Sequence, residues 1–199
     1  MKKWTDRIET PIKAELICYD VNGIQIVFGV TEEKELKLFH FSRAPFDAEN
    51  LCRKPDNWWP MEGMREAQIK ESFQLVQVNF SGYNRPYEKH GNKYIVTAPG
   101  FMLKFDSISE ERDENGDVLR IVQKDGVTGA KVESVMQFYD GLSIARMYNT
   151  VTNEGNEDQT LEYISSFSYW GIEKEQKEGI PEFISSDDKM SMVVVHNGW

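Results

Sequence analysis

Apolar and polar residues alternate along much of this chain with a period of two. The stretch 73–80 (FQLVQVNF) shows the alternation without a break. Successive residues of a strand point to opposite faces of a sheet, so this period predicts β-strands. Strands are expected at residues 14–20, 24–31, 34–42, 73–80, 101–108, 117–125, 130–140, 142–153, 159–170 and 190–195.

Turn signals separate these segments at short intervals. Asn22-Gly23 favours a tight hairpin between the first two segments, and Glu32-Glu33 joins the second segment to the third. The acidic run 109–116 (SEERDENG) is expected to form a solvated turn. Short strands separated in this way are typical of antiparallel sandwiches. The sequence therefore predicts an all-β fold, a large antiparallel β-sandwich with little helix.

Segments without this alternation are few. The one helical candidate lies within residues 59–72, where Gly63 weakens it. Two long polar insertions, 43–72 and 171–189, are expected to be mobile or functional loops. The chain lacks βαβ alternation, a G-x-G-x-x-G motif and a P-loop, which excludes a nucleotide-binding α/β domain. Residues 1–199 are expected to form a single domain.

The net charge limits the kinds of molecule that the protein is expected to bind. The 199 residues include 23 Lys and Arg against 33 Asp and Glu, which gives a net charge of -10. An acidic surface repels phosphate, so neither nucleic acid nor an anionic membrane is an expected partner. No apolar run has the length of a signal peptide or a membrane span, and the two cysteines form no disulfide scaffold. A soluble, cytoplasmic protein is expected.

Candidate chemistry is sparse in this sequence. His40, His90 and His196 do not form a metal-binding spacing, so no metal and no cofactor are predicted. His40 falls within a predicted strand and is interpreted as a core or rim histidine. Cys52 is interpreted as an incidental thiol in a polar loop. Because the acidic runs fall in turns and no G-x-S-x-G elbow is present, no catalytic residue is assigned in this chain.

The second half of the chain resembles a known enzyme family. Residues 148–172 (YNTVTNEGNEDQTLEYISSFSYWGI) are similar to a stretch of glycoside hydrolase family 36 α-galactosidases, in which a strand ends in a Thr-Asn-x-Gly turn and the next begins Leu-x-x-x-x-Ser. Residues 190–199 (MSMVVVHNGW) resemble the segment of that family where the chain departs toward the catalytic barrel. The opening hairpin and the middle strands are also similar, whereas loop 43–72 departs from the family.

The resemblance implies a β-supersandwich domain at the N-terminus of a larger enzyme. A (β/α)8 barrel and a C-terminal β domain would follow residue 199. Family members release terminal α-linked galactose from oligosaccharides with retention of configuration, using two Asp of the barrel. This chain alone would be catalytically incomplete, and it would belong to a homo-oligomer. Its partners would be the barrel, neighbouring subunits and α-galactoside oligosaccharides. The alternative is a stand-alone carbohydrate-binding β-sandwich module.

Two places are candidates for substrate contact. In loop 43–72, two large aromatic residues stand beside polar groups and form either a lip over a sugar site or a staple onto the sandwich. At the chain end, a histidine and a tryptophan follow the last predicted strand, where the tryptophan is either a ligand contact or a wedge against the barrel. The candidate residues are Asp56, Asn57, Trp58, Trp59, His196 and Trp199.

Overall fold

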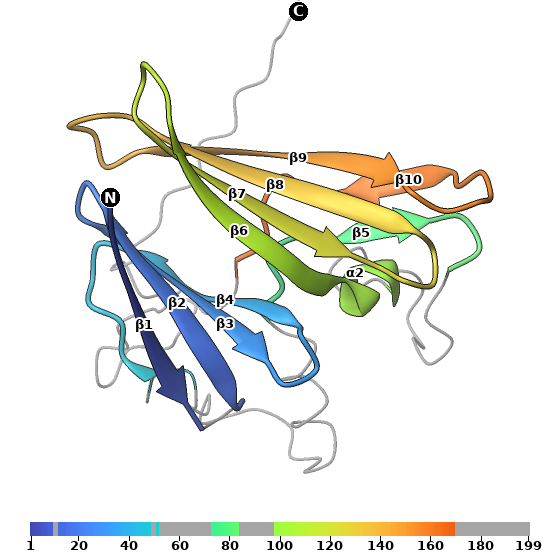
Figure 1. The fold of residues 1–199 in the computed structure, drawn as a ribbon, viewed down its shortest axis with the longest axis horizontal. Coiled ribbons are helices and arrows are strands. Elements are labelled where there is room, and N and C mark those ends of the chain that lie inside the picture. Colours follow the sequence, from blue (N-terminus) through green and yellow to red (C-terminus); the bar gives the residue numbers. More distant parts are fainter. Residues whose placement is uncertain (10–11, 49–50, 52–72, 84–97, 170–199) are drawn as a thin grey trace, which may run out of the picture.

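The computed structural model of the chain describes residues 1–9, 12–48, 51, 73–83 and 98–169. Within these ranges the fold is an antiparallel β-sandwich, as the sequence predicted (Figure 1). Two four-stranded sheets and one two-stranded sheet make up the structure. The predicted helix within 59–72, the insertion 171–189 and the strand 190–195 lie outside the described residues.

The first sheet is a meander of neighbouring strands. Asn22 (φ 53°) and Gly23 (φ 80°) both have left-handed backbone conformations, as a two-residue hairpin turn requires. The predicted hairpins around residues 22–23 and 32–33 are therefore confirmed. The sequence pattern did not predict the first strand, because its residues are mostly charged and it lies at an exposed sheet edge. In sheet order the strands are β1 (Lys2–Ile8), β2 (Ala14–Val21), β3 (Ile24–Thr31) and β4 (Leu36–Ser42).

The second sheet is also a meander, in the order β6-β7-β8-β9. The prediction of a turn over the whole acidic run 109–116 is wrong, because residues 109–112 belong to β6 and pair with β7. This edge strand carries charge on both faces, so its alternation is hidden in the sequence. The prediction that a strand starts at residue 101 is also wrong, because residue 101 belongs to the short helix α2 (Ala98–Met102). The elements are α2 (Ala98–Met102), β6 (Lys104–Arg112), β7 (Asp117–Lys124), β8 (Ala130–Phe138) and β9 (Ala145–Asn153).

The third sheet pairs β5 (Val78–Phe80) with β10 (Leu161–Ile164). The sequence predicted one strand over all of 73–80, but only its last three residues are in a strand. Phe73 has a left-handed backbone (φ 64°), and Gln74 forms an isolated bridge to Lys37 of β4. Every residue from 74 to 80 is buried. Both faces of this segment are therefore buried. The alternation of apolar and polar residues separates two buried environments here, and does not separate the core from solvent.

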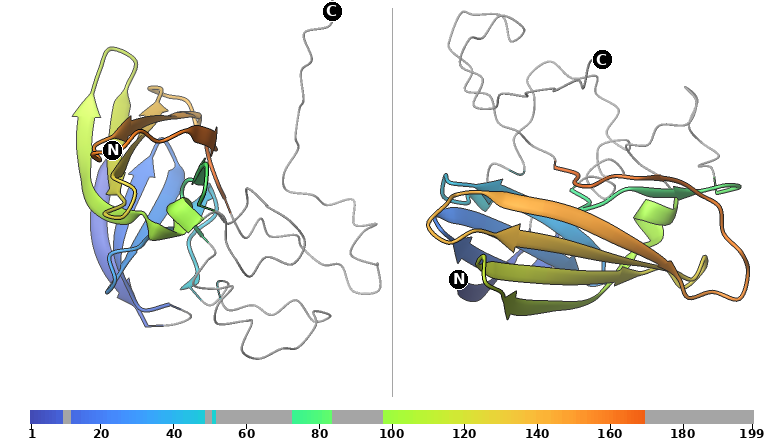
Figure 2. Two further views of the ribbon diagram at one scale, coloured as in Figure 1. Left: turned by 90° about the vertical axis from the view of Figure 1, so that its right-hand side faces the viewer. Right: turned by 90° about the horizontal axis from the view of Figure 1, so that it is seen from above.

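The β6–β9 sheet is covered on its inner face by both of the other sheets. Its end near the β6–β7 and β8–β9 turns packs against the β1–β4 sheet through one hydrophobic cluster, which includes Phe28, Leu38, Ile121 and Phe138. Its other end packs against the β5–β10 pair through a separate cluster. In Figures 1 and 2 the β5–β10 pair accordingly lies beside β9. The sandwich thus has two apolar cores along one continuous sheet.

The outer face of the β1–β4 sheet is also covered. Phe39 lies there in a third cluster with Leu16, Cys18 and Val27. Its ring lies directly over Gly29, where a Cβ atom would stand 2.1 Å from ring atom Cε2. Only glycine allows this approach, so Gly29 is a packing requirement of this face.

Candidate functional site

The substrate contacts predicted from the sequence lie outside the described residues. They are Asp56, Asn57, Trp58, Trp59, His196 and Trp199, and their roles stay predictions. The described residues form a different candidate surface, at the end of β4.

Three aromatic side chains meet where the end of β4 lies beside the segment that follows β10. Phe41, Phe167 and Tyr169 form this aromatic cluster. The Phe41 ring is edge-on to the ring of Phe167, with centroids 5.4 Å apart, and to that of Tyr169, with centroids 6.5 Å apart. Phe167 and Tyr169 are stacked, with centroids 6.0 Å apart and an angle of 24° between the ring planes. Both arrangements suit the charge distribution of aromatic rings, so the cluster is a well-packed unit.

The segment after β10 is positioned by an amide on the neighbouring strand. Asn149 of β9 donates through Nδ2 to the carbonyl oxygens of Ser165 (2.5 Å) and Ser166 (3.0 Å). These bonds hold the backbone just before Phe167. Because Phe167 and Tyr169 are two residues apart in extended chain, their side chains project to the same side. The stacked pair therefore joins two aromatic side chains that are separated by one residue.

The hydroxyl of Tyr169 adds a polar group to the cluster. Its Oη accepts the backbone N–H of Phe41 at 3.4 Å. Burial raises the pKa of Tyr169, and the hydrogen bond from Phe41 opposes that shift only in part. The hydroxyl is therefore neutral at physiological pH, where it can accept and donate hydrogen bonds.

Apolar side chains are exposed at the end of the sandwich that carries the β2–β3 turn and the end of β4. The side chain of Phe167 is 37% exposed, and Leu142 and Ile144, in the connection between β8 and β9, are 51% and 52% exposed. Residues that follow them on β9 pack in the same core cluster as Phe41 and Tyr169. Exposed aromatic and aliphatic groups of this kind suit contact with an apolar partner surface or with the flat face of a sugar ring.

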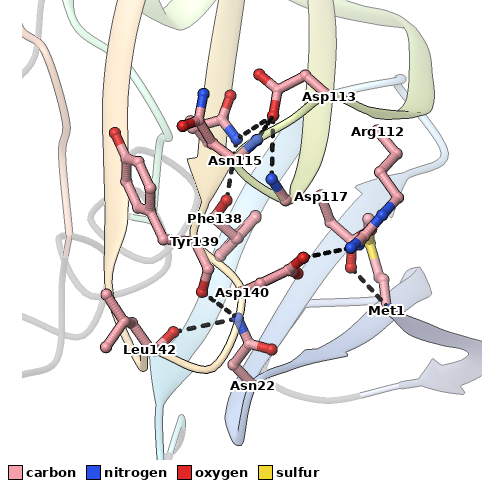
Figure 3. A network of polar contacts seen from close by, with 12 residues as sticks. Met1, Asn22, Arg112, Asp113, Asn115, Asp117, Phe138, Tyr139, Asp140 and Leu142 are labelled. Atoms are coloured by element: carbon pink, nitrogen blue, oxygen red, sulfur yellow. Dashed lines mark hydrogen bonds and ion pairs between the residues drawn. The ribbon is translucent and has the colours of Figure 1, made fainter.

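Polar contacts at the turns of this end are structural. Asn22, in the β2–β3 turn, donates through Nδ2 to the carbonyl oxygens of Tyr139 (2.7 Å) and Leu142 (3.1 Å) in the β8–β9 connection (Figure 3). The two facing sheets are thereby joined at their turns. Since these bonds satisfy backbone carbonyls, they hold the frame beside the aromatic cluster.

An ion-pair network continues from these turns to the chain start. Arg112 at the end of β6 bonds Asp117, at 3.0 Å, and Asp140 (Figure 3). The ammonium group of Met1 lies 2.8 Å from Asp117. The hydrogen bond from this ammonium group, assisted by Arg112, lowers the pKa of the Asp117 carboxyl. The network therefore ties β1 to the β6–β7 turn.

Two side chains with reactive potential lie in ordinary structural settings. His40 is half-buried, as expected of a rim histidine, and its Nε2–H donates to the carbonyl of Ala44 at 2.8 Å. Burial lowers the pKa of His40, so the ring is neutral at pH 7. Cys18 is buried on β2, and burial, with a contribution from Asp6, raises the pKa of its thiol to about 11. This thiol is therefore protonated and a weak nucleophile at neutral pH.

The described ranges contain no feature that points to a bound metal or to a membrane-spanning helix. No cluster of three or more His, Cys, Asp or Glu with metal-binding geometry occurs in the described ranges. No helix in these ranges is both long enough and apolar enough to span a membrane.

Comparisons with known proteins give no match to a family model, a curated protein or a solved structure.

The aromatic cluster was not identified as a site from the sequence. Phe41 and Tyr169 fall inside predicted strands, where an aromatic residue is most simply a core residue. One signal was present, because Phe167 and Tyr169 share one face of an extended segment that ends beside a long insertion. Their meeting with Phe41, 126 or more residues away, depends on how the sheets pack and has no local signal.

Proposed function

We propose that this chain is the N-terminal β-sandwich domain of a retaining, cytoplasmic α-galactosidase of glycoside hydrolase family 36. In this role the sandwich is an accessory domain. It supports a catalytic (β/α)8 barrel and contributes to contacts between subunits of a homo-oligomer. The two catalytic Asp belong to the barrel rather than to this domain.

The arrangement around Asn153 carries the proposal. The resemblance calls for a strand that ends in Thr-Asn-x-Gly and for a following strand that begins at a leucine. β9 ends at Asn153, and β10 begins at Leu161. Asn153 Oδ1 accepts the N–H of Gly155 at 2.9 Å, and its Nδ2 donates to the carbonyl of Glu157 at 2.7 Å. The asparagine of the motif thus builds the turn, which supports an assignment based on element order.

The aromatic cluster supports the accessory role. Phe167, Leu142 and Ile144 offer exposed apolar side chains at one edge of the sandwich. A barrel that packs against this edge would remove this surface from water, which stabilises the contact by about 25 cal/mol per Å² of apolar area. Asp56, Asn57, Trp58 and Trp59 are proposed as a lip near a sugar site.

The assignment is tested by expressing residues 1–199 in parallel with the complete reading frame that contains them. The short form should fold, bind galactose without measurable affinity and release no product from a chromogenic α-galactoside. The long form should hydrolyse the same substrate. Hydrolysis by the short form would overturn the assignment, because both catalytic carboxylates are proposed to lie after residue 199. A long form without α-galactosidase activity would overturn it as well.

A stand-alone carbohydrate-binding module is the second candidate function. The stacked pair of Phe167 and Tyr169 favours it, since a partly exposed aromatic face can receive a sugar ring. Under this alternative, melibiose added to residues 1–199 should shift the NMR signals of the Phe167 ring. A Phe167→Ala variant should lose binding, whereas Tyr148→Ala, which removes another exposed aromatic side chain on β9, should retain it. If melibiose does not shift the NMR signals, the role of an accessory domain is better supported than that of a carbohydrate-binding module.

A further inference from the structure

A line of buried and half-buried polar side chains crosses the inner face of the β6–β9 sheet. It consists of Gln123 on β7, Ser134 on β8 and Asn149 on β9, and we call it the polar seam. Ser134 is fully buried and Gln123 is 4% exposed. Ser134 lies directly opposite Asn149 in the β8–β9 ladder and opposite Ile121 in the β7–β8 ladder. Gln123 is two residues from Ile121 and is therefore diagonal to Ser134 on the same face.

The polar seam lies where the two apolar cores meet. On β8, Ala130 and Val132 belong to the core beneath the β5–β10 pair, whereas Met136 and Phe138 belong to the core beneath the β1–β4 sheet. Ser134 stands between these two sets. β9 repeats the pattern, because Asn149 separates Val151 of one core from Met147 of the other; Figure 1 shows β8 and β9 running past both sheets.

Three atoms of the seam have no hydrogen-bond partner among the residues that the structure describes. They are Gln123 Oε1, Ser134 Oγ and Asn149 Oδ1, and all three are buried. The orientation of the Asn149 amide is fixed, because its Nδ2 donates to two carbonyl oxygens, those of Ser165 and Ser166. Oδ1 is therefore a true acceptor that points away from these carbonyls. A buried acceptor without a donor destabilises the fold, so three unpaired atoms along one line require an explanation.

In the observed side-chain orientations, the three unpaired atoms cannot satisfy one another. Two amide oxygens can only accept, and the Ser134 hydroxyl supplies one proton. That proton can satisfy one of the two oxygens, which leaves the other without a donor. A ligand that brings two donor hydrogens and one acceptor would satisfy the Ser134 proton and both amide oxygens together. Water has this composition and is small enough for the interior of a sheet sandwich.

We infer that the polar seam binds ordered water. The water oxygen accepts the hydroxyl proton of Ser134, one of its hydrogens is donated to Asn149 Oδ1, and the other is directed toward Gln123 Oε1. The bound water joins the end of the sheet that faces β5–β10 to the end that faces β1–β4. This inference concerns the interior of the described fold and is independent of the proposed enzymatic role.

The test is NMR detection of long-lived internal water in isotope-labelled protein of residues 1–199. Cross-relaxation from water should appear at the Nδ2 hydrogens of Asn149 and at the backbone N–H of Ser134. A Ser134→Val variant, whose added methyl groups take the space of the water, should lose both signals. The exposed Ser107→Ala variant serves as the matched control and should keep them.

A crystal structure at a resolution that shows ordered solvent gives an independent decision on the wild-type protein. Density for a water molecule within hydrogen-bond distance of Ser134 Oγ and Asn149 Oδ1 is the expected result. The inference is overturned if Ser134 donates directly to a protein oxygen and a rotated Gln123 amide donates to Asn149 Oδ1, with no water between them. Because the crystal structure is that of the wild-type chain, this test decides the question even if the Ser134→Val variant fails to fold.

Discussion

At the scale of single residues, His40 is the histidine of the described ranges through which pH near neutrality should act on stability. Its ring is half-buried, and burial lowers its pKa below the ordinary value of 6.5. A depressed histidine pKa means that the unfolded chain binds a proton more readily than the folded chain does. The stabilising effect is therefore complete above pH 6.5 and is lost as the pH falls through the lower, folded-state pKa.

We predict that the free energy of unfolding, measured with urea, decreases between pH 7 and pH 5. His40→Gln should flatten this dependence, because glutamine keeps an N–H donor for the Ala44 carbonyl but does not titrate. The carboxyl of Asp117, whose pKa is also lowered, loses its stabilising effect at more acidic pH in both proteins. An unchanged slope in the variant would show that another group is responsible.

Gly29 gives a second prediction at this scale. In Gly29→Ala the new Cβ would meet the Phe39 ring at 2.1 Å, so the ring or the strand must move. Overpacking of this kind costs about 1–3 kcal/mol. Urea denaturation should show that loss for Gly29→Ala. Gly126→Ala is the matched control, since its Cβ would meet nothing within 4 Å, and a comparable loss there would contradict the explanation.

At the scale of elements, two kinds of strand could be predicted from the sequence. In the first kind, residues facing the core alternate with residues facing solvent; the second kind lies next to a clear turn signal. β2, β3, β7 and β8 are of these kinds. β1 and the second half of β6 are charged edge strands, so pairing rather than apolar burial defines them. The helix α2 has only five residues and contains Gly100, which disfavours helix, whereas Pro99 lies in the first turn, where proline is tolerated.

The β2–β3 turn allows its backbone and side-chain contributions to be separated. Asn22→Gly keeps a residue that favours φ of 53° but removes the bonds to Tyr139 and Leu142. Asn22→Ala removes the same bonds and also places alanine in a left-handed conformation. We expect losses of about 1 kcal/mol for Asn22→Gly and about 2–3 kcal/mol for Asn22→Ala. Equal losses in thermal unfolding would mean that the left-handed backbone contributes nothing.

At the scale of the whole molecule, the sandwich class followed from the strand pattern, but its division into two apolar cores did not. That division depends on Ser134 and Asn149 lying opposite each other, which is a property of register between strands. The aromatic cluster depends in the same way on long-range packing of Phe41 against residues after β10. The residues predicted as substrate contacts lie outside the described ranges, so mutation must decide their role.

Loop 43–72 gives the prediction that belongs to this scale. Under the proposed function, Trp58→Ala combined with Trp59→Ala in the protein made from the complete reading frame should raise KM for an α-galactoside while the protein stays folded. The physical reason is the loss of aromatic surface beside the proposed sugar site. Tyr148→Ala on the outer surface of β9 is the control, with no expected change in KM. Loss of folding, with unchanged kinetics in the soluble fraction, would mean that the two tryptophans fasten the loop to the sandwich.

The central claim is that this sandwich belongs to a retaining α-galactosidase, and the anomeric configuration of the released sugar tests it most directly. The protein made from the complete reading frame is mixed with raffinose, and proton NMR follows the first galactose formed. α-Galactose is the expected first product, with β-galactose appearing only later by mutarotation, because a double displacement retains configuration. β-Galactose as the first product, or no galactose at all, would contradict it.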